Sequence, residues 1–221
     1  MSRRADVVLF DLDGTLIDSA PDLAATVNHM RLTRGLTEVD YPRLRARVGS
    51  GARGMLLEAF DKKPGDADYE TMRQEFMTLY AERLLDTTRV FEAMEPVLQT
   101  LESQGVRWGI VTNKNARMAE HIAQGLGLHV RHAVLIGGDT TPHAKPHPAP
   151  LLEAARRIGV DPLQCVYVGD DERDVLAGRA AGMATLAAAW GYLGVGESVH
   201  AWGADAVLES PSGLLQWLAM P

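Results

Sequence analysis

The run VVLFDLDGT at residues 7–15 sets two carboxylates, two positions apart, directly after four apolar residues. A short apolar run of this kind is typical of a strand buried on both faces, as in a parallel sheet. Two ionised carboxylates about 4 Å apart repel by roughly 4 kcal/mol at an effective dielectric constant near 20. Asp11 and Asp13 therefore call for a cation, a proton or a phosphoryl group. The carboxyl end of such a strand is where open α/β sheets bind ligands.

Helical and strand patterns alternate from Phe91 onward. Apolar residues at helical spacing separate short apolar runs, which predict strands at 106–111, 134–136, 166–168, 184–188 and 206–208. Strands that alternate with helices in this way indicate an α/β fold with a parallel, doubly wound sheet.

The pattern between the first strand and Phe91 is helical for about seventy residues. Ser19 followed by Asp22 predicts a capping box at its first helix, and further helices are expected at 55–60 and 69–85. A helical block between two strands of one sheet is best explained as an insertion. We therefore expect a small helical cap domain at 18–88, inserted into a core domain formed by 1–17 and 89–221.

Net charge, hydropathy and cysteine content exclude several classes of protein. The chain has 221 residues and a formal net charge of −7 at pH 7, which argues against a partner such as nucleic acid. No apolar run approaches the roughly 20 residues that cross a bilayer, so we expect a cytoplasmic protein with no membrane partner. Cys165 is the only cysteine, so no intramolecular disulfide can form.

Four short motifs occur in order along nearly the whole chain. They are Asp11-Leu12-Asp13-Gly14-Thr15, Thr112-Asn113-Lys114, Lys145-Pro146, and Gly169-Asp170-Asp171 with Asp174. Together they resemble the motifs of the haloacid dehalogenase-like (HAD) phosphatases. The resemblance implies a Rossmann-like core with a helical cap, a Mg²⁺ cofactor, and hydrolysis of a small anionic phosphate ester through an aspartyl phosphate.

The resemblance assigns catalytic roles to four of these residues. Asp11 would attack phosphorus, and Asp13 would give a proton to the leaving alkoxide and later take one from water. Thr112 would hold phosphate oxygens, although a threonine after a strand also caps helices. Lys145 would balance the charge of Asp11 and the phosphoryl group, although it could instead be a loop lysine in water.

Magnesium prefers oxygen ligands, and the set that the resemblance implies is Asp11, Asp170 and the main-chain carbonyl of Asp13. Asp174, one helical turn after Asp170, would orient that ligand or a bound water. Asp171 has two interpretations of equal weight, a catalytic role or an acid at a helix N-terminus.

Substrate contacts are expected from both domains. In the core, Gly14 would let the chain approach the phosphate closely, and Asn113 would contact the substrate. In the cap, the glycine-rich loop at 48–53 resembles the specificity loop of the phosphoglycolate phosphatase-like group, although its glycines also suit an ordinary turn. Gly51 would approach the ligand there, and Arg53 would meet an anionic group such as a carboxylate.

The substrate itself has several interpretations. The overall resemblance favours a phosphoglycolate phosphatase-like enzyme, whereas the segments 108–114, 191–192 and 202–205 look closer to N-acetylmuramic acid 6-phosphate phosphatases. A β-phosphoglucomutase-like mutase is a further alternative. Asp13 counts against a dehalogenase, which lacks this second acid. The helical insertion counts against a receiver-type signalling domain.

Overall fold

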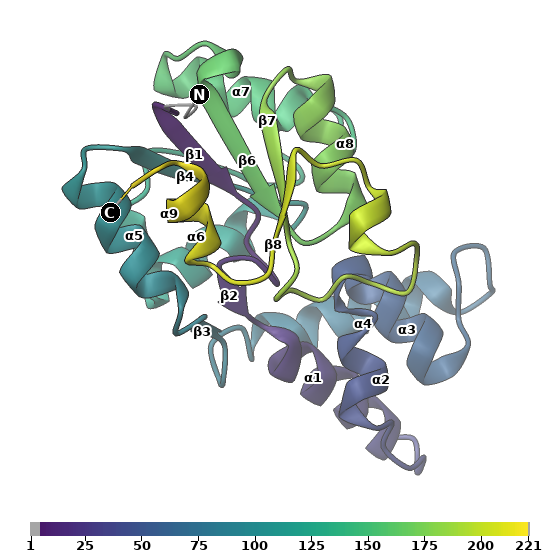
Figure 1. Cartoon of the computed structure of the whole chain (residues 1–221). Coiled ribbons are helices and arrows are strands. Elements are labelled where there is room, and N and C mark those ends of the chain that lie inside the picture. Colours follow the sequence, from purple (N-terminus) through teal and green to yellow (C-terminus); the bar gives the residue numbers. More distant parts are fainter. Residues whose placement is uncertain (1–4, 221) are drawn as a thin grey trace.

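Six strands of the computed structural model, which describes residues 5–220, form one parallel sheet (Figure 1). The predicted strands after Phe91 are present to within one or two residues, and the α/β fold class is confirmed. The order across the sheet is β5 (Leu135–Ile136), β4 (Arg107–Val111), β1 (Val7–Phe10), β6 (Cys165–Gly169), β7 (Ala184–Ala188) and β8 (Ala206–Leu208). Strand β1 therefore lies between β4 and β6, and the chain segments that follow these three strands share one edge.

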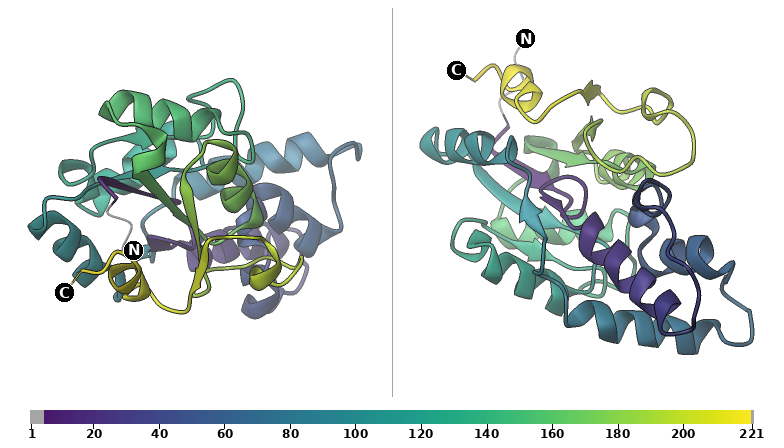
Figure 2. Two further views of the ribbon diagram at one scale, coloured as in Figure 1. Left: turned by 45° about the horizontal axis from the view of Figure 1, so that its top comes forward. Right: turned by 90° about the horizontal axis from the view of Figure 1, so that it is seen from below.

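Helices cover both faces of the sheet (Figure 2). Because side chains alternate along a strand, Val8 and Phe10 pack on one face and Val7 and Leu9 on the other. The first face is covered by α5 (Met94–Ser103), α6 (Ala116–Gly125) and α9 (Gly213–Trp217), and the second by α7 (Ala149–Ile158) and α8 (Glu172–Ala180). Short 3₁₀ helices complete these connections at η2 (Leu128–Val130), η3 (Pro162–Gln164) and η4 (Val199–Ala201).

A two-stranded antiparallel ribbon, β2 (Ile17–Asp18) with β3 (Arg89–Val90), brackets the helical block. The block contains α1 (Ala20–Leu32), α2 (Tyr41–Arg45), η1 (Val48–Ser50), α3 (Gly51–Phe60) and α4 (Tyr69–Ala81), and Figure 1 shows its helices beside the sheet rather than on either face. Its own interior holds large buried side chains such as Leu44, Met55 and Phe76. We refer to residues 18–88 as the cap and to the rest as the core.

The capping box predicted at the start of α1 does not form. Ser19 is the N-cap residue, but its side chain makes no capping hydrogen bond and donates to Asp13 instead. The carboxylate of Asp22 accepts from the main-chain nitrogens of Thr87 (2.9 Å) and Thr88 (2.9 Å). Asp22 thus serves as acceptor for the backbone where the chain returns from cap to core, including the buried N–H of Thr88, and Ser19 instead holds a carboxylate of the first motif.

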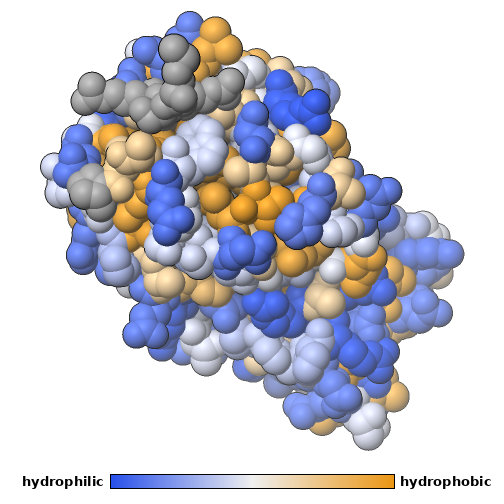
Figure 3. Space-filling model, in the orientation of Figure 1, coloured by the Kyte–Doolittle hydropathy of each residue, from blue (hydrophilic) through white to orange (hydrophobic). Residues whose placement is uncertain are grey.

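Hydrophilic side chains are spread over the face shown in Figure 3, and apolar residues gather mainly near the middle of the core. Within residues 5–220, no helix combines the length and the apolar character that crossing a membrane requires.

Candidate active site

Three acidic residues come together at the carboxyl edge of the sheet, two of them directly after the two central strands and the third on the helix α8. Asp11 follows β1, where its main-chain nitrogen donates to Val168 O (2.9 Å), and Asp170 directly follows β6. Asp174 lies in the first turn of α8. One carboxylate oxygen from each lies within 4.8 Å of the others, and both Asp170 and Asp174 are buried. The structure thus gathers three carboxyl groups where water has little access.

Lys145 is the buried cation of this cluster. Its Nζ lies 2.9 Å from Asp11 Oδ1 and 2.7 Å from Asp174 Oδ1, and it donates to Val111 O (3.0 Å) and Tyr167 Oη (2.7 Å). Burial lowers the pKa of Lys145, but the two carboxylates outweigh burial and raise it, so the amine stays protonated. The interpretation of Lys145 as a loop lysine in water is wrong, since the side chain is 2% exposed.

One ammonium group does not neutralise three carboxylates. Burial raises the pKa of Asp11 to about 6, against the opposing effect of Lys145. Burial, followed by the charges of Asp11 and Asp174, raises the pKa of Asp170 well above its usual value. Asp11 Oδ1 is buried and, within residues 5–220, its close polar neighbour is the charge of Lys145 Nζ at 2.9 Å, with no hydrogen bond of good geometry. These acids and this oxygen fit a divalent cation, since hard cations take carboxylate oxygens as ligands.

Asp13 belongs to a second, less buried pair. Its Oδ1 lies 3.1 Å from Lys114 Nζ, and Ser19 Oγ donates to the same oxygen. Lys114 also donates to the hydroxyl of Tyr80 (2.9 Å), which comes from α4 of the cap. Burial lowers the pKa of Lys114, but Asp13 and Tyr80 outweigh it and raise that pKa. The pair therefore joins the second acid of the first motif to the cap.

Gly14 leaves room for the side chain of Asp170. Its φ is +85°, and a Cβ there would lie 2.2 Å from Asp170 Oδ2, so no other residue fits without displacing the acid. Asp170 also accepts from Thr15 Oγ1 (3.0 Å) and from Tyr192 N (2.7 Å). Gly14 does not line the cavity described below, and its close approach to a bound phosphate stays a prediction.

The second motif supports Lys145 from the neighbouring strand. Thr112 directly follows β4, is buried, and its hydroxyl accepts from Lys114 N (3.1 Å). Asn113 accepts from Lys145 N (2.9 Å) and donates to Lys145 O (3.0 Å), so both ends of its amide fix the lysine's backbone. Both residues line the cavity, but the Asn113 amide is committed to Lys145 rather than free for a substrate.

Asp171 begins α8 as its N-cap residue. Its carboxylate accepts from Arg173 N (2.9 Å), and its main-chain nitrogen donates to Asp174 Oδ2 (3.1 Å). This capping box fixes the turn that presents Asp170. The interpretation of Asp171 as a helix N-terminal acid is therefore confirmed by the structure.

A cavity of about 300 Å³ lies over these groups, between core and cap. Its core wall contains the catalytic candidates, and its cap wall is formed by the loop at 48–52 and by Leu23, Phe76, Met77 and Tyr80. Gly51 lines the cavity, and its approach to a ligand stays a prediction, whereas Arg53 is exposed and does not line the cavity. Successive residues of a helix are rotated by about 100° around its axis. Arg53 can therefore point away from the cavity although Gly51 and Ala52 line it. The arginine that lines the cavity is Arg173.

Several residues of the site were not found from the sequence: Tyr80, Tyr167, Arg173 and Tyr192. Tyr167 could have been found from the sequence. It is the one aromatic polar side chain in an otherwise apolar strand, and a buried tyrosine needs a hydrogen-bond partner. It donates to Val111 O (2.7 Å) beside Lys145. Tyr80 and Tyr192 carried no local signal, since their partners lie 34 and 173 residues away.

Comparison with known proteins shows the family of this chain. Residues 8–188 match the family model for haloacid dehalogenase-like hydrolases. A phosphoglycolate phosphatase of Xanthomonas campestris pv. campestris (strain 8004) is 50% identical over 214 residues, covering 97% of this chain and 96% of the relative. An N-acetylmuramic acid 6-phosphate phosphatase of Pseudomonas aeruginosa is 40% identical over 215 residues, covering 97% and 95%.

A solved structure supports the same family. The crystal structure of a predicted phosphoglycolate phosphatase from Haemophilus somnus 129PT superposes with a TM-score of 0.84 at 27% identity, covering 98% of each chain. The family match, the acids at the strand ends and these relatives lead to one conclusion: this chain belongs to the haloacid dehalogenase-like hydrolase family and is a phosphatase, a phosphoric monoester hydrolase.

Proposed function

We propose that this protein is a Mg²⁺-dependent phosphatase that hydrolyses a small anionic phosphate ester through an aspartyl phosphate on Asp11. The observation that carries the proposal is the buried cluster of Asp11, Asp170 and Asp174 around a single ammonium group, that of Lys145. A cluster with this excess of negative charge favours a divalent cation and the phosphoryl group of a substrate that binds with it.

Asp11, Asp170 and the main-chain carbonyl of Asp13 would hold the metal. When bound, Mg²⁺ supplies positive charge that stabilises the phosphoryl oxygens during transfer. Asp174 would orient this set, because it is fixed at once by Lys145 and by the capping box of α8.

The reaction proceeds in two displacements. In the first, an oxygen of Asp11 bonds to phosphorus while the bond to the leaving oxygen breaks and Asp13 transfers a proton to that oxygen. In the second, Asp13 takes a proton from water as the water oxygen attacks phosphorus, and the bond to Asp11 breaks. Inorganic phosphate leaves, and both carboxyl groups return to their starting states. Lys145 and the hydroxyl of Thr112 would hold the phosphoryl oxygens in place.

We propose 2-phosphoglycolate as the first substrate to test, since the Xanthomonas relative bears that name at 50% identity. A second candidate, N-acetylmuramic acid 6-phosphate, is favoured by the Pseudomonas relative and by the apolar cap wall. Phe76, Met77 and Leu23 would suit a leaving group that carries nonpolar atoms. Values of kcat/KM for the two esters, measured side by side, decide between them.

Metal removal tests the proposal. We expect hydrolysis of p-nitrophenyl phosphate and of the preferred ester to vanish after dialysis against EDTA and to return when Mg²⁺ is added, because the acid cluster repels a phosphoryl group without a cation. The controls are Ca²⁺, which is larger and less suited to octahedral coordination, and an untreated sample. Full activity in thoroughly metal-free protein would contradict the proposal.

A further inference from the structure

Arg173 is a cation of the cavity that the proposed reaction does not use. The other lysine and arginine side chains that line the described cavity are Lys114 and Lys145, and each is paired with a carboxylate of the first motif. Arg173 lies in the first turn of α8, in the core, and faces the same cavity. Its position therefore calls for a separate explanation.

The guanidinium group of Arg173 is held in a fixed plane. Its Nε lies 2.7 Å from Asp171 Oδ1, and its Nη2 lies 2.8 Å from Asp171 Oδ2. A fork of two parallel hydrogen bonds sets both the direction and the rotation of the guanidinium, which a lysine ammonium cannot do. Asp171 is itself fixed as the N-cap of α8, directly after Asp170.

The same Nη2 reaches across to the cap, where it donates to the main-chain oxygen of Gly49. Gly49 lies in the loop at 48–52 that lines the cavity. A Cβ at Gly49 would lie 3.3 Å from Asp171 Oδ2, so the loop backbone and this carboxylate approach closely. The contact thus runs from the turn that presents Asp170 to the backbone of the cap loop.

We propose that Arg173 is a positioning residue that holds the loop at 48–52 over the cavity, so that the enzyme discriminates among leaving groups only when this contact is made. The choice of substrates in this inference rests on the proposed phosphatase function. The contact between Arg173 and the loop does not depend on that function. Because the acceptor is a main-chain oxygen, the contact fixes the backbone of the loop and does not depend on the side chains of the cap. Arg173 acts through the loop and takes no part in the two displacements.

The test compares Arg173→Gln and Arg173→Lys with Arg179→Gln. Arg179 is a matched control because it lies on the same helix and also donates to a main-chain oxygen, that of Gly203, but is exposed and outside the cavity. Steady-state rates are measured with p-nitrophenyl phosphate and with whichever of the two natural esters the unmodified enzyme prefers. Hydrogen exchange of the peptide that spans residues 48–52 is followed in the same proteins.

We expect Arg173→Gln to lower kcat/KM on the preferred ester about tenfold or more, mostly through KM, since one charged hydrogen bond is lost. The loss on p-nitrophenyl phosphate should be at least fivefold smaller, and the 48–52 peptide should exchange faster. Arg173→Lys should not restore discrimination, because one ammonium group cannot span both oxygens of Asp171 and the Gly49 carbonyl. Arg179→Gln should match the unmodified enzyme in every measurement.

Equal losses on both substrates with unchanged exchange at 48–52 would overturn the inference, as would full discrimination in Arg173→Lys. If the unmodified enzyme hydrolysed no phosphate ester, the proposed function would fail while the exchange comparison would still decide whether Arg173 holds the loop.

Discussion

The two walls of the cavity are built in different ways. On the core wall, Lys145 contacts four groups within 3.0 Å, and Asp170 accepts from two donors while a third residue, Gly14, makes room for it. On the cap wall, a loop of small residues and the apolar side chains of Phe76 and Met77 face the same space. The core wall is polar, buried and fixed by many partners, and the cap wall is mostly apolar with few.

Under the proposed function, the core wall would carry out the chemistry and the cap wall would select the substrate. Transfer of a phosphoryl group depends on charges that are already in position, since reorganising them during the reaction costs free energy. Choice of leaving group depends on shape and on apolar contact, which a loop and one helix face can vary without disturbing the acids. Mutations on the two walls should therefore affect activity in different ways.

The largest expected effect lies on the core wall. Asp11→Asn removes the oxygen that we propose as the nucleophile but keeps the shape of the side chain, so kcat should fall by about four orders of magnitude or more on every substrate while the protein stays folded. The measurements are steady-state rates and circular dichroism. Asp139→Asn is the matched control, because Asp139 follows β5 at the same edge of the sheet but is exposed and outside the cavity. Turnover by Asp11→Asn at the rate of the control would contradict the assignment.

An intermediate effect is expected on the cap wall. Met77→Trp fills part of the cavity, so kcat/KM for N-acetylmuramic acid 6-phosphate should fall about tenfold or more, the scale of an overpacked site, and that for 2-phosphoglycolate should fall less. Thr78→Trp places the same side chain on the exposed side of α4 and should change neither rate. Equal losses on both esters would show that α4 supports folding or closure and does not select the substrate.

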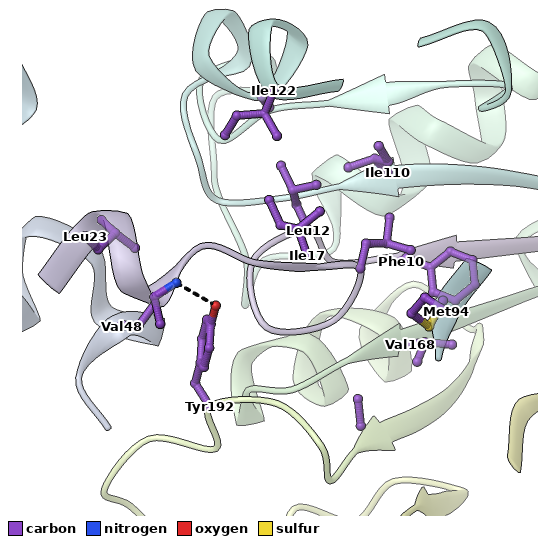
Figure 4. Close-up of a cluster of buried hydrophobic side chains, with 14 of the residues drawn as sticks. Phe10, Leu12, Ile17, Leu23, Val48, Met94, Ile110, Ile122, Val168 and Tyr192 are labelled. Atoms are coloured by element: carbon purple, nitrogen blue, oxygen red, sulfur yellow. Dashed lines mark hydrogen bonds between the residues drawn. The ribbon is translucent and has the colours of Figure 1, made fainter. Parts of the chain in front are cut away.

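The smallest expected effect on activity lies at the junction of the two parts. Tyr192 comes from the core, and Figure 4 shows its side chain directed toward Leu23 and Val48 of the cap, with its hydroxyl in a hydrogen bond. That hydroxyl accepts from Ser19 N (2.8 Å) and Ala20 N (3.0 Å) and lies 3.0 Å from Asp18 Oδ1, while the guanidinium of Arg45 lies over the ring.

Tyr192→Phe should lower the free energy of unfolding by about 1–3 kcal/mol, because the buried Ser19 N–H loses its acceptor and the Ala20 N–H keeps only Asp18 Oδ1 (3.3 Å). The rate on p-nitrophenyl phosphate should stay within about twofold, the effect of a change away from the reacting groups. Urea unfolding measures the first quantity. Tyr69→Phe is the control, a buried tyrosine whose hydroxyl makes no hydrogen bond within residues 5–220. An unchanged urea midpoint in Tyr192→Phe would mean that the junction does not depend on this hydroxyl.

Sequence reasoning succeeded where function depends on short motifs at strand ends. Buried strands read as apolar runs, and the carboxyl ends of neighbouring parallel strands meet at one edge, so the sequence alone is enough to place Asp11, Thr112 and Asp170 together. It failed where a side chain's direction mattered. Arg53 was expected in the cavity and is exposed, and Ser19 was expected to cap α1 and donates to Asp13.

The sequence by itself determined the fold class, the helical insertion and the acids that line the core wall, because hydrophobic periodicity and local motifs act over a few residues. Only the tertiary structure decided which groups pair: Lys145 with Asp11 and Asp174, Lys114 with Asp13 and Tyr80, and Arg173 with the cap loop. The last of these contacts joins residues 124 positions apart. Such contacts depend on how the surfaces of the cap and the core are placed against each other, and no periodicity or motif along the chain specifies that placement.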